Sequence, residues 1–134
     1  MKLVADTNRI VAALIAGGAS RKILMNPQHE FMAPDFSKEE LEKHSDEILK
    51  KSGIDMATFD VLISWLYENI ETVPMRQYKN ALKEAERLIG GRDKKDAPFL
   101  ALAIAHKADG IWSDDKDFEA QKKVRIFKTK ELLA

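Results

Sequence analysis

The sequence predicts an α/β fold of three layers, in which helices cover both faces of a central, mostly parallel sheet of four or five strands. Two observations lead to this prediction. Short continuous apolar runs, which are typical of strands buried on both faces, recur along the chain. A longer stretch with apolar residues at helical spacing follows most of these runs. We expect one domain, residues 1–134, because no repeat or linker divides the chain.

The N-terminal part predicts a strand and two helices. Residues 3–5 form the first apolar run, and residues 8–18 follow with helical spacing up to the Gly17–Gly18 pair. Ser20 is expected to cap a short second helix at residues 21–26, because a serine hydroxyl can accept a hydrogen bond from the first turn.

The middle of the chain predicts a second strand and two longer helices. The strand is EFMAP, residues 30–34, and a largely charged helix follows over residues 35–53, where a glycine ends it. Asp55 then provides an N-cap for an amphipathic helix over residues 56–67. Its aromatic side chains are most simply explained as core.

A marginal third strand at residues 71–75 and a helix at residues 77–89 come next, and two glycines break that helix. Asp96 then stands as N-cap of a helix with Pro98 in its first turn. Its body, residues 99–105, is apolar on every side, which predicts a buried helix. The chain is expected to end with two short strands and a helix, at residues 111–112, 124–127 and 129–134.

The composition excludes several classes of function. A chain with 45% hydrophobic and 33% charged residues and no long apolar run predicts a soluble protein without membrane association. The start MKLVADTN lacks the apolar stretch of a signal peptide, so we expect a cytoplasmic location. The absence of cysteine excludes disulfides and thiolate metal sites. Lys plus Arg and Asp plus Glu both number 22, so net charge does not indicate a nucleic-acid partner.

Acidic residues follow two of the predicted strands. Asp6 comes directly after the first strand, and Asp114, Asp115 and Asp117 follow residues 111–112. If these strands are neighbours in a parallel sheet, the acids meet at the edge where such sheets bind ligands. Crowded carboxylates repel one another, and Mg²⁺ or Mn²⁺ would relieve the repulsion through oxygen ligands.

Four motifs in this order resemble the PIN domain, a family that includes the toxin ribonucleases of VapBC modules and several RNA-processing nucleases. The motifs are VADTN at the start, EEL after the second strand, DAPFLALA in the middle and SDDKDF near the end. The resemblance covers essentially the whole chain. It implies a PIN-like version of the three-layer fold.

The resemblance assigns acids of the family pattern to positions in this chain. Asp6 matches the N-terminal metal aspartate, and Asn8 the small polar residue beside it. Glu40 matches the second acid, although Glu39 and Glu42 leave the register open. Asp96 matches the third acid.

The last motif of the family is Thr or Ser, any residue, Asp, any residue, Asp or Asn, and then an aromatic. Ser113, Asp115, Asp117 and Phe118 fill these places, and Asp114 falls at a variable position that we expect to face solvent.

The resemblance implies a metal-dependent endoribonuclease that hydrolyses phosphodiester bonds of single-stranded or structured RNA. Asp6, Asp96 and Asp115 would hold Mg²⁺ or Mn²⁺, and Glu40 and Asp117 would complete the catalytic set. The expected contacts to water or RNA phosphate are Asn8, Arg9, Ser113, Arg92 and Lys95. The family also implies a homodimer, and a toxin of this kind would have an antitoxin partner.

Other interpretations stay open at the level of sequence. A PIN fold can serve as an RNA-binding or protein-binding scaffold with little catalysis, and the same carboxylates would suit a phosphatase of small substrates. Asp96 would also make a good helix cap without any metal, and SDDKDF could be a solvated turn.

Overall fold

The computed structural model describes residues 1–15, 18–91 and 94–133. Within these residues a five-stranded sheet has the order β3-β2-β1-β4-β5, and every neighbouring pair is parallel. The strands are β1 (Lys2–Ala5), β2 (Glu30–Pro34), β3 (Ile70–Val73), β4 (Gly110–Trp112) and β5 (Ile126–Phe127). The predicted α/β class is therefore confirmed, and β1 and β4 are neighbours.

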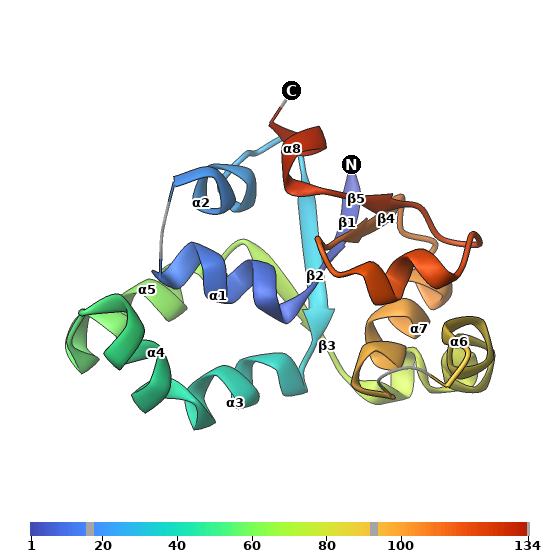
Figure 1. Cartoon of the computed structure of the whole chain (residues 1–134), viewed down its shortest axis with the longest axis horizontal. Helices are drawn as coiled ribbons and strands as arrows, with labels where there is room; N and C mark the ends of the chain where they lie inside the picture. The colour runs from blue at the N-terminus through green and yellow to red at the C-terminus, as the bar shows by residue number, and fades with distance from the viewer. Residues whose placement is uncertain (16–17, 92–93, 134) are drawn as a thin grey trace.

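Helices cover both faces of the sheet, as Figure 1 shows. The helices α1 to α5 lie to one side of it, and α6 and α7 lie to the other. The α-helices are α1 (Thr7–Ile15), α2 (Gly18–Leu24), α3 (Phe36–Lys43), α4 (Ser45–Ser52), α5 (Met56–Tyr67), α6 (Leu82–Ile89), α7 (Ala97–Ala105) and α8 (Thr129–Leu132). The short 3₁₀ helices are η1 (Met75–Gln77), η2 (Lys79–Ala81), η3 (Lys94–Asp96) and η4 (Lys116–Ala120).

The alternation of side chains along the central strands divides the core into two clusters. Leu3 and Ala5 face the cluster beneath α1 to α5, whereas Val4 between them faces the cluster that contains α7. Phe31 and Met32 of β2 divide in the same way. Both faces of the sheet are therefore apolar, which explains the continuous apolar runs in the sequence.

Several local predictions are confirmed. Asp55 caps α5 by accepting a hydrogen bond of 2.8 Å from the Thr58 backbone N–H. Gly53 ends α4 in the left-handed conformation with φ 73°, and Gly90 does the same for α6. The helix that is apolar on every side is α7, and six of its nine residues are buried.

The predicted helix over residues 35–53 is wrong in one respect, because it is two helices. The chain turns at His44, whose backbone (φ −98°, ψ 18°) departs from helical geometry. The break lets Leu41 of α3 and Ile48 of α4 both reach the core cluster beneath α1.

Two other helix starts also differ from prediction. The helix expected over residues 77–89 begins only at Leu82, because Tyr78 (φ −128°, ψ 0°) turns the chain and buries its ring. Ser20 does not cap α2 but lies buried inside it, since the helix begins at Gly18. The expected end of α1 at Gly17 lies outside the described residues.

In the ranges that the structure describes, no helix combines the length and apolar character needed to cross a bilayer.

Candidate active site

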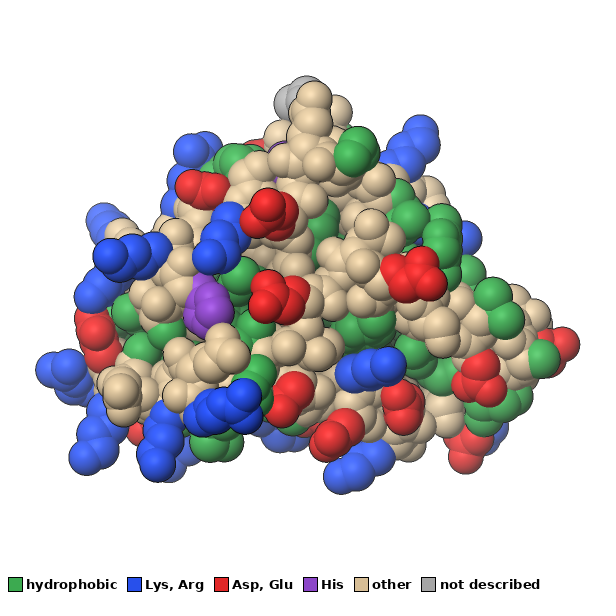
Figure 2. Space-filling view, turned by 180° about the vertical axis from the view of Figure 1, so that it is seen from behind, with side chains coloured by type: hydrophobic (Ala, Val, Ile, Leu, Met, Phe, Trp, Pro, Cys, Tyr) green, Lys and Arg blue, Asp and Glu red, His purple; other side chains and the backbone are tan. Residues whose placement is uncertain are grey.

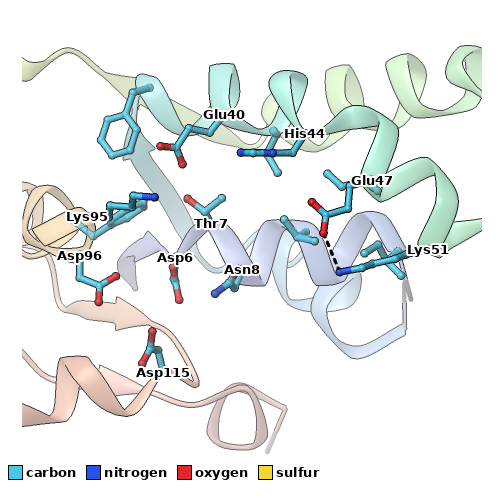
Figure 3. Close-up of a pocket in the computed structure, with 16 residues that line it drawn as sticks. Asp6, Thr7, Asn8, Glu40, His44, Glu47, Lys51, Lys95, Asp96 and Asp115 are labelled. Carbon is cyan, nitrogen blue, oxygen red and sulfur yellow. Dashed lines mark ion pairs between the residues drawn. The ribbon is translucent and has the colours of Figure 1, made fainter. Parts of the chain in front are cut away.

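A pocket of about 360 Å³ opens at the carboxyl ends of β1 and β2, beside the turn that follows β4. Its walls come from the start of α1, from α3 and α4, and from the segment that leads into α7 (Figure 3). The polar residues that line it are Asp6, Thr7, Asn8, Glu40, His44, Glu47, Lys51, Lys95, Asp96 and Asp115. Apolar side chains of α1, α3, α4 and α7 complete the lining.

Asp6 lies where β1 passes into α1, and it is only 5% exposed. Its Oδ2 accepts a hydrogen bond of 2.8 Å from the Ser113 hydroxyl. Burial raises the pKa of the Asp6 carboxyl, and the negative charge of Asp115 acts in the same direction. The bond from Ser113 and the backbone N–H of Asn8 oppose that shift but do not cancel it.

The turn after β4 brings Asp115 to the pocket lining and places Asp117 beside it. The Asp115 backbone N–H donates to Ser113 Oγ at 3.0 Å, so the same hydroxyl joins this turn to Asp6. Asp115 Oδ1 in turn accepts from the Asp117 backbone N–H at 2.9 Å. These bonds fix the backbone of the turn, and Phe118 anchors its end in the core with no exposed surface.

Asp96 stands at the N-cap position of α7, as predicted, but its side chain makes no capping hydrogen bond to that helix. One carboxylate oxygen from each of Asp96, Asp115 and Asp117 lies within 4.8 Å of the other two. Asp96 therefore does not cap α7 through its side chain. Its carboxylate lies instead close to those of Asp115 and Asp117.

The arrangement of the predicted metal ligands differs in one detail from the sequence-based expectation. In Figure 3 the side chains of Asp6, Asp96 and Asp115 converge on the same space. The group with oxygens within 4.8 Å of one another, however, contains Asp117 in place of Asp6.

Glu40 faces this space from the opposite wall, on α3 (Figure 3). Glu39 is exposed and does not line the pocket. Glu42 lines a separate depression beside α5. Of the three glutamates that the sequence left open, Glu40 is therefore the one that the structure brings to the pocket.

The predicted substrate contacts divide into two groups. Asn8 and Lys95 line the pocket, and Ser113 is buried beneath it against Asp6. Arg9 does not line the pocket, because its Nη1 pairs with Asp114 Oδ2 at 2.8 Å. Arg92 lies outside the described residues.

Asp114 is exposed, as expected, but it does not simply face solvent. Its two oxygens accept hydrogen bonds from the backbone N–H and the hydroxyl of Thr129, at 2.9 and 2.7 Å. Partial burial raises the pKa of Asp114, but the bonds from Thr129 and the charges of Arg9 and Lys128 together lower it below its ordinary value.

Sequence reasoning missed one wall of the pocket. His44, Glu47 and Lys51 were not among the predicted site residues, yet all three line the pocket, and Glu47 and Lys51 form an ion pair of 3.4 Å. These residues follow Glu40 at intervals of three and four, so they share its side of α3 and α4. Helical spacing counted from Glu40 would have identified them.

The donor set suits a hard divalent cation. All the gathered side-chain ligand atoms are carboxylate oxygens, which Mg²⁺ and Mn²⁺ prefer, and no histidine belongs to the group of three acids. A cation would also offset the repulsion that contributes to the raised pKa of Asp6. The residues present therefore fit Mg²⁺ or Mn²⁺.

Comparison with known proteins agrees with this geometry. No curated protein matches the chain significantly. A family model described as PIN domain matches residues 4–132, which include each of the acids that reach the pocket. This match spans nearly the whole chain, and the three-layer fold with its parallel sheet agrees with it. The chain therefore belongs to the PIN domain family.

Proposed function

We propose that this protein is an endoribonuclease that uses Mg²⁺ or Mn²⁺ to hydrolyse phosphodiester bonds in RNA. One observation carries the proposal: four acids from separate parts of the chain, Asp6, Glu40, Asp96 and Asp115, line a single pocket of a nuclease-type fold. Asp117 stands beside two of them. Acids so far apart in sequence would not converge at the ligand-binding edge of the sheet merely to cap helices.

The acids have different roles in the proposed reaction. Asp96 and Asp115 would hold the cation, with Asp6 and Asp117 as the further acids of the site. A bound divalent cation lowers the pKa of a water ligand and stabilises charge on the phosphate that is attacked. Ser113 orients the Asp6 carboxylate through its hydrogen bond, and Glu40 faces the same space from the opposite wall.

RNA affinity must come largely from groups other than these acids, because a cluster of carboxylates repels phosphate. Lys95 and Asn8 line the pocket and are the proposed contacts to the RNA backbone. Figure 2 shows the back of the molecule, where lysines and arginines crowd along the left edge, on the side where Figure 1 has α6 and α7. Exposed Lys83 and Arg87 of α6 belong to this side.

The family resemblance extends the proposal to a toxin of a toxin–antitoxin pair that acts in the cytoplasm as a homodimer. The helix α5 buries Phe59 and leaves Val61 and Trp65 exposed at 68% and 39%. These two side chains are the proposed dimer contact. Light scattering at tens of micromolar tests it: a dimer is expected, and Val61→Asp should give a monomer.

The experiment that tests the proposed function measures cleavage of a generic RNA with Mn²⁺ and with EDTA, for the wild-type protein and Asp115→Asn. Cleavage that needs both the metal and Asp115 supports the nuclease. A small phosphate ester assayed in parallel separates it from a phosphatase. RNA binding without cleavage in Mn²⁺ or Mg²⁺ would favour the scaffold interpretation instead.

A further inference from the structure

Three residues that do not line the pocket, Arg9, Asp114 and Thr129, form a connected group that the metal chemistry does not require. Asp114 Oδ2 lies 2.8 Å from Arg9 Nη1 and accepts from the Thr129 hydroxyl at 2.7 Å. Its other oxygen accepts from the Thr129 backbone N–H at 2.9 Å. Arg9 Nη1 is also 3.4 Å from the Thr129 hydroxyl, which closes the triangle.

This group, the Asp114 clamp, joins three parts of the chain that meet at the candidate site. Arg9 is on α1, three residues after Asp6, and Thr129 is the first residue of α8. Asp114 immediately precedes Asp115 on the turn after β4. The indole Nε1 of Trp112 donates to the Thr129 hydroxyl at 3.1 Å, so the clamp also rests on the end of that strand.

Asp114 and Asp115 are consecutive residues whose side chains take opposite roles. Asp115 lines the pocket, whereas Asp114 bonds to α1 and α8 and is absent from the lining. In extended backbone, such as that of Asp115 (φ −78°, ψ 127°), successive side chains point to opposite sides. Fixing the Asp114 carboxylate on one side therefore fixes the direction of Asp115 on the other.

We propose that Asp114, Arg9 and Thr129 are positioning residues, which hold Asp115 in the orientation needed to bind the metal. The inference rests on the proposed metal-dependent function, and it gives Arg9 a role different from the phosphate contact that the sequence suggested. The Arg9 side chain is only 22% exposed, and Nη1 is already engaged with Asp114. Groups that orient metal ligands in this way typically affect metal affinity by about 10-fold to 100-fold.

The test compares Asp114→Asn, Arg9→Met and Thr129→Val with a matched control, Glu84→Gln. Glu84 is exposed to a similar extent as Asp114, 34% against 37%, and forms an ion pair with Lys123 rather than with any clamp residue. Mn²⁺ affinity is measured by calorimetry, and folding is checked by circular dichroism. Amide hydrogen exchange of residues 115–118 is measured without metal, so that it reports on the turn alone.

Each clamp variant should weaken Mn²⁺ binding by about tenfold, and it should accelerate exchange at the Asp117 amide, which bonds to Asp115. Cleavage should recover at saturating Mn²⁺, and the double variant Asp114→Asn with Arg9→Met should be no worse than either single variant. Glu84→Gln should match the wild type in every measurement.

Wild-type Mn²⁺ affinity and exchange in folded clamp variants would overturn the clamp while leaving the metal site in place. A higher KM for RNA in Arg9→Met alone, with unchanged metal affinity, would make Arg9 a phosphate contact and overturn it as well. Failure of the wild-type protein to bind Mn²⁺ would overturn the proposed function and with it the role of the clamp in metal binding. Exchange at residues 115–118 would then show separately whether the clamp holds the turn.

Discussion

The Ser113 hydroxyl donates a hydrogen bond of 2.8 Å to Asp6 Oδ2 and so joins residues that are 107 positions apart in sequence. The bond spans the carboxyl ends of β1 and β4, which pair in parallel with Ala5 opposite Trp112. It is buried, and the same hydroxyl accepts from the Asp115 backbone N–H. One serine therefore sets the relative positions of two proposed catalytic acids.

Replacing this serine should make metal binding more sensitive to pH. The bond from Ser113 lowers the Asp6 pKa against the raising effect of burial, so Ser113→Ala should raise that pKa further. Protons then compete with Mn²⁺ for Asp6 over a wider pH range. The variant should therefore lose more Mn²⁺ affinity near about pH 5 than near about pH 8. Calorimetric titrations at about these two pH values measure the effect.

Ser37→Ala is the matched control for this experiment. Ser37 is also a buried serine, and its hydroxyl bonds to the Tyr67 hydroxyl at 3.3 Å rather than to a carboxylate. The Mn²⁺ affinity of Ser37→Ala should depend on pH as that of the wild type does. Equal behaviour of the two variants would mean that the bond to Asp6 has no influence on metal binding.

Asp6→Asn should stabilise the metal-free protein at neutral pH while it impairs cleavage. The Asp6 pKa is raised in the folded state, so folded protein binds more protons than unfolded protein between the ordinary value of 3.8 and the raised one. The stabilising contribution of that proton is present below the ordinary pKa and is lost as pH rises through the folded pKa. Thermal melting in EDTA across this pH range measures the effect. The melting temperature of the wild type should fall below that of Asp6→Asn by an amount that grows as the pH rises.

Glu40→Gln should reduce Mn²⁺-dependent cleavage by about tenfold or more, whereas Glu39→Gln should leave it near the wild-type rate. Both residues are on α3, but only Glu40 lines the pocket. The two variants remove the same charge from adjacent positions, so nonspecific charge effects cancel in the comparison. Greater loss in Glu39→Gln would place the second acid one residue earlier.

Gly110→Ala should destabilise the fold by about 1–3 kcal/mol through overpacking. A Cβ at this position would lie 2.5 Å from the Arg125 carbonyl oxygen and 2.5 Å from the Phe127 ring. Denaturant unfolding measures the cost. Because the backbone carbonyl cannot move aside easily, Phe127→Leu in the same chain should recover only part of the stability.

The sequence was sufficient to predict the fold class and to select acids that line the pocket, because strands and strand ends leave local patterns. Apolar runs such as residues 3–5 predict strands buried on both faces; Asp6 follows one such strand directly, and Asp115 lies three residues after the end of another. Once β1 and β4 pair, as observed, these acids must share one edge of the sheet. The family pattern then supplied Glu40 and Asp96, which no strand end marks.

The remaining features depend on tertiary contacts that no local pattern carries. The break at His44 reflects how α3 and α4 pack on one core, since the charged sequence alone suits an uninterrupted helix. The bonds of Asp114 require Thr129, which is 15 residues away and belongs to a short C-terminal helix. A position expected to face solvent thus lies at the centre of a network.

The most direct test of the account is the rate of RNA cleavage in Mn²⁺ by the wild-type protein and by Asp115→Asn and Asp117→Asn, each normalised to folded protein by circular dichroism. Asp115 lines the pocket and has an oxygen within 4.8 Å of both Asp96 and Asp117, whereas Asp117 is not part of the pocket lining. We expect metal-dependent cleavage by the wild type, none by Asp115→Asn and a reduced rate for Asp117→Asn. Cleavage by folded Asp115→Asn at the wild-type rate would contradict the assignment of this pocket as the active site.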